Sequence, residues 1–400
     1  MRHKMDAQIK IIIAPAPFKG SLSNIQAARI MEKAVLSIFP RSEIIKFPLA
    51  DGGEGTIDAV KKISGGTFRH EEIHGPLFKK RKAAWLKKGS TAFIEMARAS
   101  GLTLLENEEK NPLKTTTFGT GELLARAASA GCRRIFVGAG GSATNDAGIG
   151  ALTALGIKFR GKNGKIVYPG TGFDLAEIKS IDNSGILPEI LRCKITMLSD
   201  VENRLFGKKG AAFIYAPQKG ANEKAVELLD RGLRNFAETV KKLYGREISS
   251  LRGGGAAGGI VAGLASFLDT EILSGADTLM EMGKFESRLE SADILLTGEG
   301  RIDEQTGYGK SLKKVFKLAE KHGVKTIALA GGIENPVYKK EFKNVVFASI
   351  LPGPSSVEEA MKHAKRNLYN TTVQMLRLHK ISRSIRVMER EKGRKHAGKS

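Results

Sequence analysis

Charged side chains and glycines are concentrated in residues 297–310, directly after the apolar residues 294–296. Glu299, Arg301 and Asp303 place both signs of charge between the glycines. In open α/β sheets ligands bind outside the carboxyl ends of the strands, and glycine lets the backbone approach an anionic ligand. We therefore expect residues 294–296 to form a buried parallel strand that ends in a turn carrying a binding or catalytic site. The alternative is an ordinary solvated loop.

A lysine follows the first apolar segment of the chain. Residues 9–15 are predicted to form a buried strand, and a helix is expected over residues 24–38 with Ser21 or Ser23 as its N-cap. The N-terminus of a helix offers free N–H groups and a positive dipole end, and Lys19 precedes it. Lys19 could therefore bind a phosphate or a carboxylate. An ordinary solvated lysine is an equal alternative.

Carboxylates follow two further predicted strands. Asp51 and Glu54 stand among glycines after residues 43–49, and Asp200 comes directly after residues 194–199. A carboxylate at the carboxyl end of a strand is placed to act as a general base or as a metal ligand. Asp51 could hold a metal or a substrate hydroxyl. Glu54 could take part in substrate binding or could simply stabilise the positive end of the next helix.

One turn combines glycines with hydroxyl groups. Residues 138–148 read GAGGSATNDAG and join a strand expected over residues 134–138 to a helix. Such a turn can offer backbone N–H groups to phosphates, and Asp146 could serve a metal. The alternative is that Ser142 or Thr144 only caps the helix.

Two other glycine patterns resemble nucleotide-binding motifs without meeting their requirements. Residues 307–311 read GYGKS, like the end of a P-loop, but Glu304 occupies the position of the first P-loop glycine. Residues 253–258 match GxGxxG, although residues 247–252 before them do not read as a buried strand. We conclude that the chain is not a P-loop enzyme, and we interpret the second pattern as a close backbone approach at a helix start.

Apolar segments alternate with amphipathic helical segments, and glycine is abundant at 46 residues. This pattern predicts an α/β protein of two domains. Two strands near the start of the chain and three near its end could form one flavodoxin-like parallel sheet. We expect a flavodoxin-like α/β domain from residues 1–70 and 286–380, an inserted α/β domain from residues 71–285, and a basic, disordered tail from residues 381–400.

The formal net charge of +23 raises the question of nucleic-acid binding. Lysines and arginines are spread along the predicted helices, and the sequence has no helix-turn-helix or aromatic RNA-binding motif. A positive field also attracts small anions such as ATP or a carboxylate. We therefore favour small anionic partners over nucleic acid.

The two cysteines, Cys132 and Cys193, lie beside apolar segments without a CxxC pattern or a neighbouring histidine. This gives little support to a disulfide or a zinc site. The start of the chain lacks a signal-peptide pattern, and no apolar run reaches membrane-spanning length. We expect a cytoplasmic protein that has no membrane partner.

Five short motifs occur along the chain, namely FKGSL at residues 18–22, ADGGEGT at 50–56, GGSATND at 140–146, PQKGA at 217–221 and TGEGRID at 297–303. In this order they make the chain closely resemble the bacterial glycerate kinase family, from about residue 9 to residue 378. The resemblance implies ATP-dependent phosphorylation of D-glycerate with Mg²⁺, in a two-domain α/β enzyme whose second domain is inserted in the first. It implies 2-phosphoglycerate as the product, while 3-phosphoglycerate stays open.

Phosphoryl transfer requires charge neutralisation at the phosphates and a carboxylate for the attacking hydroxyl. The expected catalytic residues are Asp200, as the first candidate for the base, Lys19, Arg301 and Asp303. The expected substrate-binding residues are Lys19, Ser21, Asp51, Glu54 and Arg301. The expected nucleotide-binding residues are Gly140, Gly141, Ser142, Thr144, Asn145, Gly254 and Gly255. Asp51, Asp200 and Glu299 are the expected Mg²⁺ ligands, and Asp51, Glu299 and Asp303 compete with Asp200 for the role of base.

Two positions depart from the family pattern. Ala16 stands where family members usually have aspartate, and Arg204 stands where they usually have proline. The missing carboxylate at Ala16 bears on metal or substrate binding. Two alternatives therefore stay open: a kinase for another small hydroxy acid, or an inactive kinase-like protein that binds nucleic acid through its basic surface. A homo-oligomer is also left open.

Overall fold

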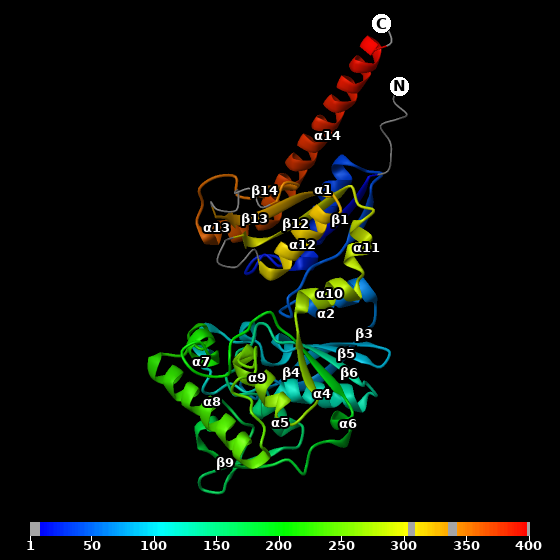
Figure 1. The fold of residues 1–400 in the computed structure, drawn as a ribbon. Helices are drawn as coiled ribbons and strands as arrows, with labels where there is room; N and C mark the ends of the chain where they lie inside the picture. Colours follow the sequence, from blue (N-terminus) through cyan, green and yellow to red (C-terminus); the bar gives the residue numbers. More distant parts are fainter. Residues whose placement is uncertain (1–8, 303–308, 335–341, 398–400) are drawn as a thin grey trace. The chain divides into compact units, whose positions relative to one another are not determined.

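The computed structural model describes residues 9–302, 309–334 and 342–397, with the backbone alone for residues 309, 310 and 383–397. The chain forms two compact units (Figure 1). The first contains Met1–Leu49 and Met280–Ser400, and the second contains Ala50–Leu279. The unit boundaries fall at residues 50 and 280, whereas the sequence suggested 71 and 286. Helix α2 (Thr56–Ser64) packs against strands β4 and β5 of the second unit, which moves the first boundary.

The first unit contains five parallel strands in the order β14-β13-β12-β1-β2. They are β1 (Lys10–Pro15), β2 (Glu43–Lys46), β12 (Ile294–Ile302), β13 (Lys325–Ile333) and β14 (Val345–Ser349). Counted along the chain within this unit, the order is 2-1-3-4-5, which is the flavodoxin-like order. The order reverses between β1 and β12, so the carboxyl ends of these two strands form the topological switch point, where ligands bind in such sheets.

Helices complete the first unit, namely α1 (Asn24–Ile38), α11 (Phe285–Leu289), α12 (Gly309–Lys321), α13 (Val357–Lys362) and α14 (Ala364–Ala397). Strands β1 and β12 are buried along most of their length, as expected for a parallel sheet between helices. Ile13 and Leu296 of these strands share one core with Met31 of α1 and Leu368 of α14.

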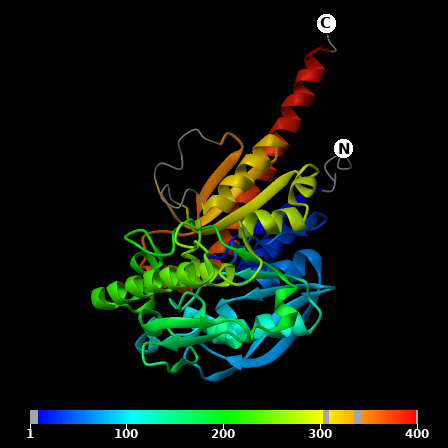
Figure 2. The same ribbon diagram turned by 60° about the horizontal axis from the view of Figure 1, so that its bottom comes forward.

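Helix α14 extends beyond the sheet of its own unit (Figures 1 and 2). It packs against α1 and continues to Ala397. The prediction of a disordered tail from residue 381 therefore does not hold for residues 381–397, which continue this helix. Arginine, lysine and glutamate are frequent in this segment, and all three favour helix.

The second unit is built on a sheet of six strands in the order β11-β10-β6-β5-β4-β3. Strands β5, β6, β10 and β11 are parallel, whereas β3 and β4 are antiparallel, which confirms the α/β class. The bounds are β3 (Thr67–His74), β4 (Lys80–Lys88), β5 (Thr91–Glu95), β6 (Arg134–Gly138), β10 (Lys194–Leu198) and β11 (Thr270–Leu273). A smaller antiparallel sheet contains β7 (Lys158–Gly161), β8 (Ile166–Val167) and β9 (Ile178–Asp182).

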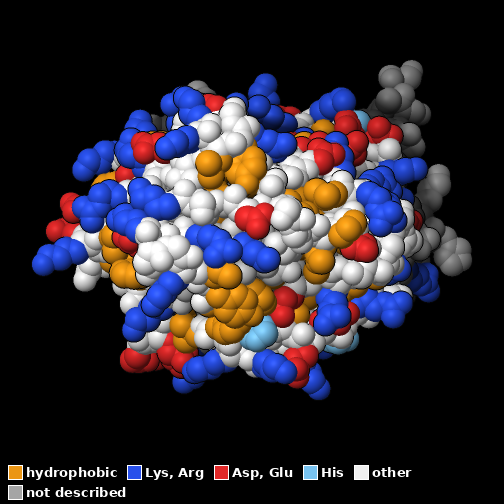
Figure 3. All heavy atoms as spheres, turned by 90° about the horizontal axis from the view of Figure 1, so that it is seen from below, with side chains coloured by type: hydrophobic (Ala, Val, Ile, Leu, Met, Phe, Trp, Pro, Cys, Tyr) orange, Lys and Arg blue, Asp and Glu red, His pale blue; other side chains and the backbone are white. Residues whose placement is uncertain are grey.

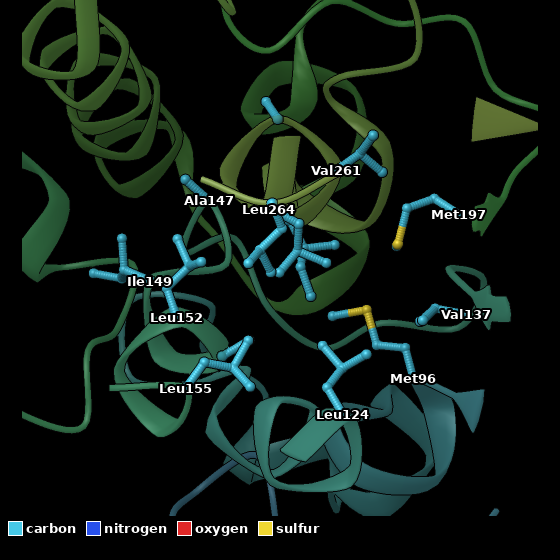
Figure 4. Packing of buried hydrophobic residues seen from close by; sticks show 14 of the residues in the cluster. Met96, Leu124, Val137, Ala147, Ile149, Leu152, Leu155, Met197, Val261 and Leu264 are labelled. Atoms are coloured by element: carbon cyan, nitrogen blue, oxygen red, sulfur yellow. The ribbon is translucent and has the colours of Figure 1, made fainter. Parts of the chain in front are cut away.

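The remaining α-helices of this part of the chain are α3 (Ala97–Ser100), α4 (Phe118–Ser129), α5 (Ile149–Ala154), α6 (Pro188–Leu191), α7 (Ala211–Tyr215), α8 (Glu223–Tyr244), α9 (Ala256–Ala265) and α10 (Gly275–Met282). Leu124 of α4, Leu152 of α5 and Leu264 of α9 pack together with Val137 and Met197 of the sheet (Figure 4). This core fixes the turns that follow β6 and β10.

Basic side chains are dispersed on the face drawn in Figure 3, where acidic side chains lie between them. In the described part of the chain, no helix is both long enough and apolar enough to cross a bilayer.

Candidate active site

Strand β12 does not end at residue 296 as predicted. Residues 297–302 continue the strand, and Glu299 and Arg301 pair with Ala330 and Gly332 of β13. The predicted turn at residues 297–300 is therefore wrong, because the neighbouring strand supplies hydrogen-bond partners for this glycine-rich segment. Pairing with β1 stops at Gly298, so β12 extends past the end of β1 at the switch point.

The turn that contains Lys19 lies against this extension of β12. The Phe18 N–H donates to the Leu22 carbonyl over 2.9 Å, and the Ser21 hydroxyl donates to the Phe18 carbonyl over 2.9 Å. A Cβ atom placed on Gly300 would lie 3.3 Å from the backbone nitrogen of Lys19, so the two segments are neighbours. Lys19 is exposed. Ser21 closes the turn, and Ser23 caps α1 with a reciprocal bond to Gln26.

Arg301 is exposed and forms an ion pair with Glu334, which follows β13. Glu299 is half-buried on the same strand as Arg301. Asp303 lies outside the described residues. Sequence reasoning missed Glu334, although it follows a predicted strand and the rule that located Arg301 would also have located it.

In the second unit, Asp51 and Glu54 lie in a turn that contacts the ends of the parallel strands. The Gly140 N–H donates to the Gly52 carbonyl over 3.0 Å. A Cβ atom on Gly275 would lie 2.4 Å from the Asp51 carbonyl carbon. The Asp51 turn therefore also contacts the segment that follows β11. Both carboxylates are exposed, and Glu54 accepts a hydrogen bond from the Thr103 hydroxyl over 2.8 Å.

Asp200 is half-buried between the ends of β10 and β11. Burial raises its pKa above the usual range for aspartate, and the charges of Asp51 and Asp277 add to this effect. Hydrogen bonds from the Ser274 side chain and the Gly275 backbone oppose it. The structure therefore brings Asp51 and Asp200 together, and adds Asp277 to them. A carboxylate whose pKa is raised is suited to accept a proton.

The glycine turn after β6 is exposed over only a short stretch. Gly141 is exposed and Gly140 is half-buried, whereas Ser142, Thr144 and Asn145 are buried. The hydroxyl of Thr144 and both polar atoms of the Asn145 amide have no hydrogen-bond partner among the described protein atoms. Of the five residues predicted to bind a nucleotide in this turn, only the two glycines are accessible from outside in this conformation, which the sequence alone did not reveal.

A buried lysine supports this turn from the interior. The Lys219 ammonium donates to the Ser142 hydroxyl over 2.8 Å and to the Thr144 carbonyl over 2.7 Å. Lys219 is 2% exposed, and burial lowers its pKa to about 7 although the charge of Asp146 opposes the shift. The sequence analysis included Lys219 only as part of the PQKGA motif, and its burial and hydrogen bonds are visible only in the tertiary fold.

Asp146 is wholly buried rather than open to a metal. Its carboxylate accepts hydrogen bonds from the N–H and hydroxyl of Thr117 and from the N–H groups of Gly148 and Gly150. Burial raises its pKa, while these bonds oppose the change. Asp146 therefore stabilises the junction between the turn and α5.

The amides of Gly254 and Gly255 are already used within the protein. The Gly254 N–H donates to the Leu251 carbonyl and the Gly255 N–H to the Asn203 carbonyl, each over 2.9 Å. A Cβ atom on Gly255 would lie 2.2 Å from the Arg204 carbonyl oxygen. This geometry favours close backbone packing over phosphate binding at these two positions.

A second buried network fixes the start of α2. Glu95 is 2% exposed and accepts hydrogen bonds from the Ile57 N–H and from Arg98, each over 2.7 Å. Arg98 also forms an ion pair with Asp58 at 2.5 Å. Burial raises the pKa of Glu95, and the Arg98 charge counteracts this. The network holds the helix that follows the Asp51 turn, and no local sequence pattern predicted it.

Comparison with known proteins identifies the family of this fold and these motifs. The model of the Glycerate kinase family matches residues 11–380. The chain belongs to the glycerate kinase family. Members of this family are phosphotransferases with an alcohol group as acceptor, so the described turns and carboxylates belong to a kinase.

Several members of the family match this chain over nearly their whole length. The glycerate kinase of Halalkalibacterium halodurans is 41% identical over 88% of this chain and 93% of its own. The glycerate 2-kinase of Escherichia coli K12 is 40% identical over 90% of this chain and 95% of its own. The crystal structure of a protein assigned as glycerate kinase 2 from Salmonella typhimurium LT2 matches with a TM-score of 0.79 and 37% identity, covering 94% of this chain and all of that one.

Proposed function

We propose that the protein phosphorylates D-glycerate with ATP and Mg²⁺ to give 2-phosphoglycerate, acting in the cytoplasm. The observation that carries this proposal is Asp200, a half-buried carboxylate of raised pKa at the end of β10, which pairs with the strand β6 that precedes the glycine turn. The similarity to the E. coli glycerate 2-kinase supports the substrate and the product.

In this mechanism Asp200 takes the proton of the C2 hydroxyl of glycerate. The hydroxyl oxygen forms a bond to the γ-phosphorus of ATP while the bond from that phosphorus to the β–γ bridging oxygen breaks, which leaves ADP. The backbone N–H group of Gly141 is proposed to position the phosphates, since the Gly140 N–H already donates to the Gly52 carbonyl. Lys19 and Arg301 of the first unit are proposed to bind anionic groups, since a guanidinium suits a carboxylate.

Carboxylate oxygens are the protein ligands that Mg²⁺ prefers, and it usually takes only one or two of them together with substrate phosphates. Among the described residues, no three acidic, histidine or cysteine side chains lie close enough to hold a metal alone. Asp51 beside Asp200 fits this limited protein contribution, and Glu299 of the first unit is the other candidate. When bound, Mg²⁺ would neutralise phosphate charge.

A kinase for another small hydroxy acid is the remaining enzymatic alternative. We would measure ADP release with Mg-ATP and a panel of hydroxy acids, namely D-glycerate, L-glycerate, glycolate and D-lactate. The proposal expects kcat/KM to be highest for D-glycerate. A higher value for another acid would replace the substrate, and ADP release that no acid stimulates would contradict the proposed function.

A further inference from the structure

The exposed part of the glycine turn is held at both ends. On one side, Ala139 and Gly140 donate their N–H groups to Leu198 and Gly52 over 3.1 and 3.0 Å. On the other side, Ser142 is held by the Lys219 ammonium. Between these anchors only the short segment at Gly141 is exposed. Lys219 therefore helps to hold that segment, together with the Leu102 N–H, which donates to the Gly141 carbonyl over 2.8 Å.

Lys219 is itself firmly placed. It ends the short 3₁₀ turn Pro217–Lys219, in which the Lys219 N–H donates to the Ala216 carbonyl over 3.0 Å. The next residue, Gly220, packs so closely on another segment that a Cβ atom there would lie 2.1 Å from the Lys110 carbonyl oxygen. The side chain thus enters the interior from a fixed backbone.

An ammonium in this position is costly for the free protein. A buried charge is destabilising unless a partner compensates it. Asp146 acts on Lys219 through its charge, but its carboxylate is bonded to Thr117 and the α5 backbone. Among the described residues no carboxylate forms an ion pair with Lys219. An anion at the glycine turn would supply the missing counter-charge.

We propose that Lys219 is a positioning residue for phosphoryl transfer, which holds the Gly140–Gly141 turn through Ser142 and Thr144 and presents a buried positive charge to the phosphates bound there. This inference rests on the proposed function. It adds a residue that acts through the turn and not by contact with the reacting atoms. Because the charge is buried, its effect on an anion is stronger than that of an exposed lysine.

The charge of Lys219 is sensitive to pH near neutrality, since its pKa is lowered to about 7. Asp146 is the charged group that acts on it, and Lys110 on the neighbouring segment directs its own ammonium to the Asn107 side chain. The kcat/KM for ATP reports the free enzyme and should fall as pH rises through the pKa of Lys219.

The test compares Lys219→Met with Ser142→Ala and with the control Lys224→Met, an exposed lysine on α8. We would measure ATP dissociation constants by calorimetry and kcat/KM for ATP from pH 6 to 9. At pH 6, Lys219→Met should weaken ATP binding about tenfold or more and should abolish the fall in kcat/KM near pH 7. Ser142→Ala should weaken ATP binding less, and the control should match the wild type.

Unchanged ATP affinity in Lys219→Met across this pH range, in a sample with wild-type thermal unfolding, would overturn the inference. If Lys219→Met does not fold, Ser142→Ala decides, because unchanged affinity there also overturns it. A wild type that binds ATP through Lys219 but releases no glycerate-dependent ADP would refute the proposed function alone. A wild type that does not bind ATP would overturn both.

Discussion

The parallel sheet of the first unit and the mixed sheet of the second unit present charged groups differently at the carboxyl ends of their parallel strands. In the first unit, the strand order reverses between β1 and β12. Lys19 follows β1, Arg301 lies near the end of β12, and both are basic and exposed. In the second unit, β5, β6, β10 and β11 succeed one another without reversal. Its charged groups are gathered by turns that fold over the strand ends, and Asp200 and Lys219 are withdrawn from solvent.

This contrast shows where substitutions should matter most. Exposed ion pairs such as Arg301 with Glu334 contribute at most about 1 kcal/mol and exchange partners easily. Buried groups shift their pKa values and cannot exchange without cost. We therefore expect larger effects from the second unit than from the first.

The largest effect is expected for Asp200→Asn. Loss of the base should lower kcat by about 100-fold or more, measured by ADP release at saturating substrates. The pKa of Asp200 is raised in the folded state, so the folded protein binds this proton more tightly than the unfolded chain, and stability falls as pH rises through that pKa. The variant should therefore be at least as stable as the wild type at neutral pH.

Asp277→Asn is the matched control for this prediction, because Asp277 acts on Asp200 only through its charge in the proposed mechanism. Its kcat should remain close to that of the wild type. Near-normal turnover in Asp200→Asn would remove Asp200 from the role of base. A raised Mg²⁺ requirement at unchanged kcat would reassign it as a metal ligand.

The next effect is expected on stability, from Glu95→Gln. The change removes the charged acceptor of Arg98 in a buried site and should lower the free energy of unfolding by about 2 kcal/mol. Urea unfolding measures this. Asp58→Asn at the exposed end of the same network should cost less than about 1 kcal/mol. Equal losses in the two variants would show that burial does not control this network.

A smaller effect is expected for Arg301→Gln. Removal of one charge-assisted hydrogen bond to an anionic substrate should lower kcat/KM about tenfold, as steady-state rates with varied glycerate and ATP would show. Glu334→Gln removes the ion-pair partner but leaves the guanidinium, so kcat/KM should stay within about threefold of the wild type. A loss in Glu334→Gln as large as in Arg301→Gln would show that the pair itself is needed.

The smallest effect is expected for Ala16→Asp. Ala16 is half-buried, and its N–H donates to the Gly298 carbonyl over 2.8 Å, a bond that aspartate retains. Introducing the aspartate that family members usually have at this position should then change kcat/KM by less than about tenfold, which corresponds to about 1.4 kcal/mol of transition-state stabilisation. Mg²⁺ titrations of both proteins measure this. Activity that appears only in Ala16→Asp would show that the natural chain is a disabled kinase.

Much of the fold could be predicted from the sequence. The five strands of the first unit follow from their apolar runs, and the α/β pattern suggested that they form one flavodoxin-like sheet. The extent of β12 could not be predicted, because glycines at 298 and 300 read as a turn until pairing with β13 is known. Helical continuation of α14 was likewise hidden by the charge of the tail.

The sequence predicted which residues form the candidate site better than it predicted whether those residues are buried or exposed. Asp51 and Asp200 were selected because they follow strands, and the structure places both at one sheet edge. Burial of Ser142, Thr144 and Asn145 was not predictable, because a GSATN segment has the composition of a solvated turn. Lys219 and Glu95 were missed for a related reason. Each forms a hydrogen bond with a residue that is distant in the sequence, and no local sequence pattern predicts such a bond.

The most direct test of the account is the identity of the product. We would incubate the purified protein with Mg-ATP and D-glycerate and record the proton-coupled ³¹P NMR spectrum. Phosphorylation at C2 predicts ADP together with a phosphomonoester doublet, because the phosphate of 2-phosphoglycerate is bonded through oxygen to a carbon that carries one hydrogen. A triplet would identify transfer to the C3 hydroxyl and contradict the proposed regiochemistry, and the absence of any new phosphomonoester would contradict the kinase itself.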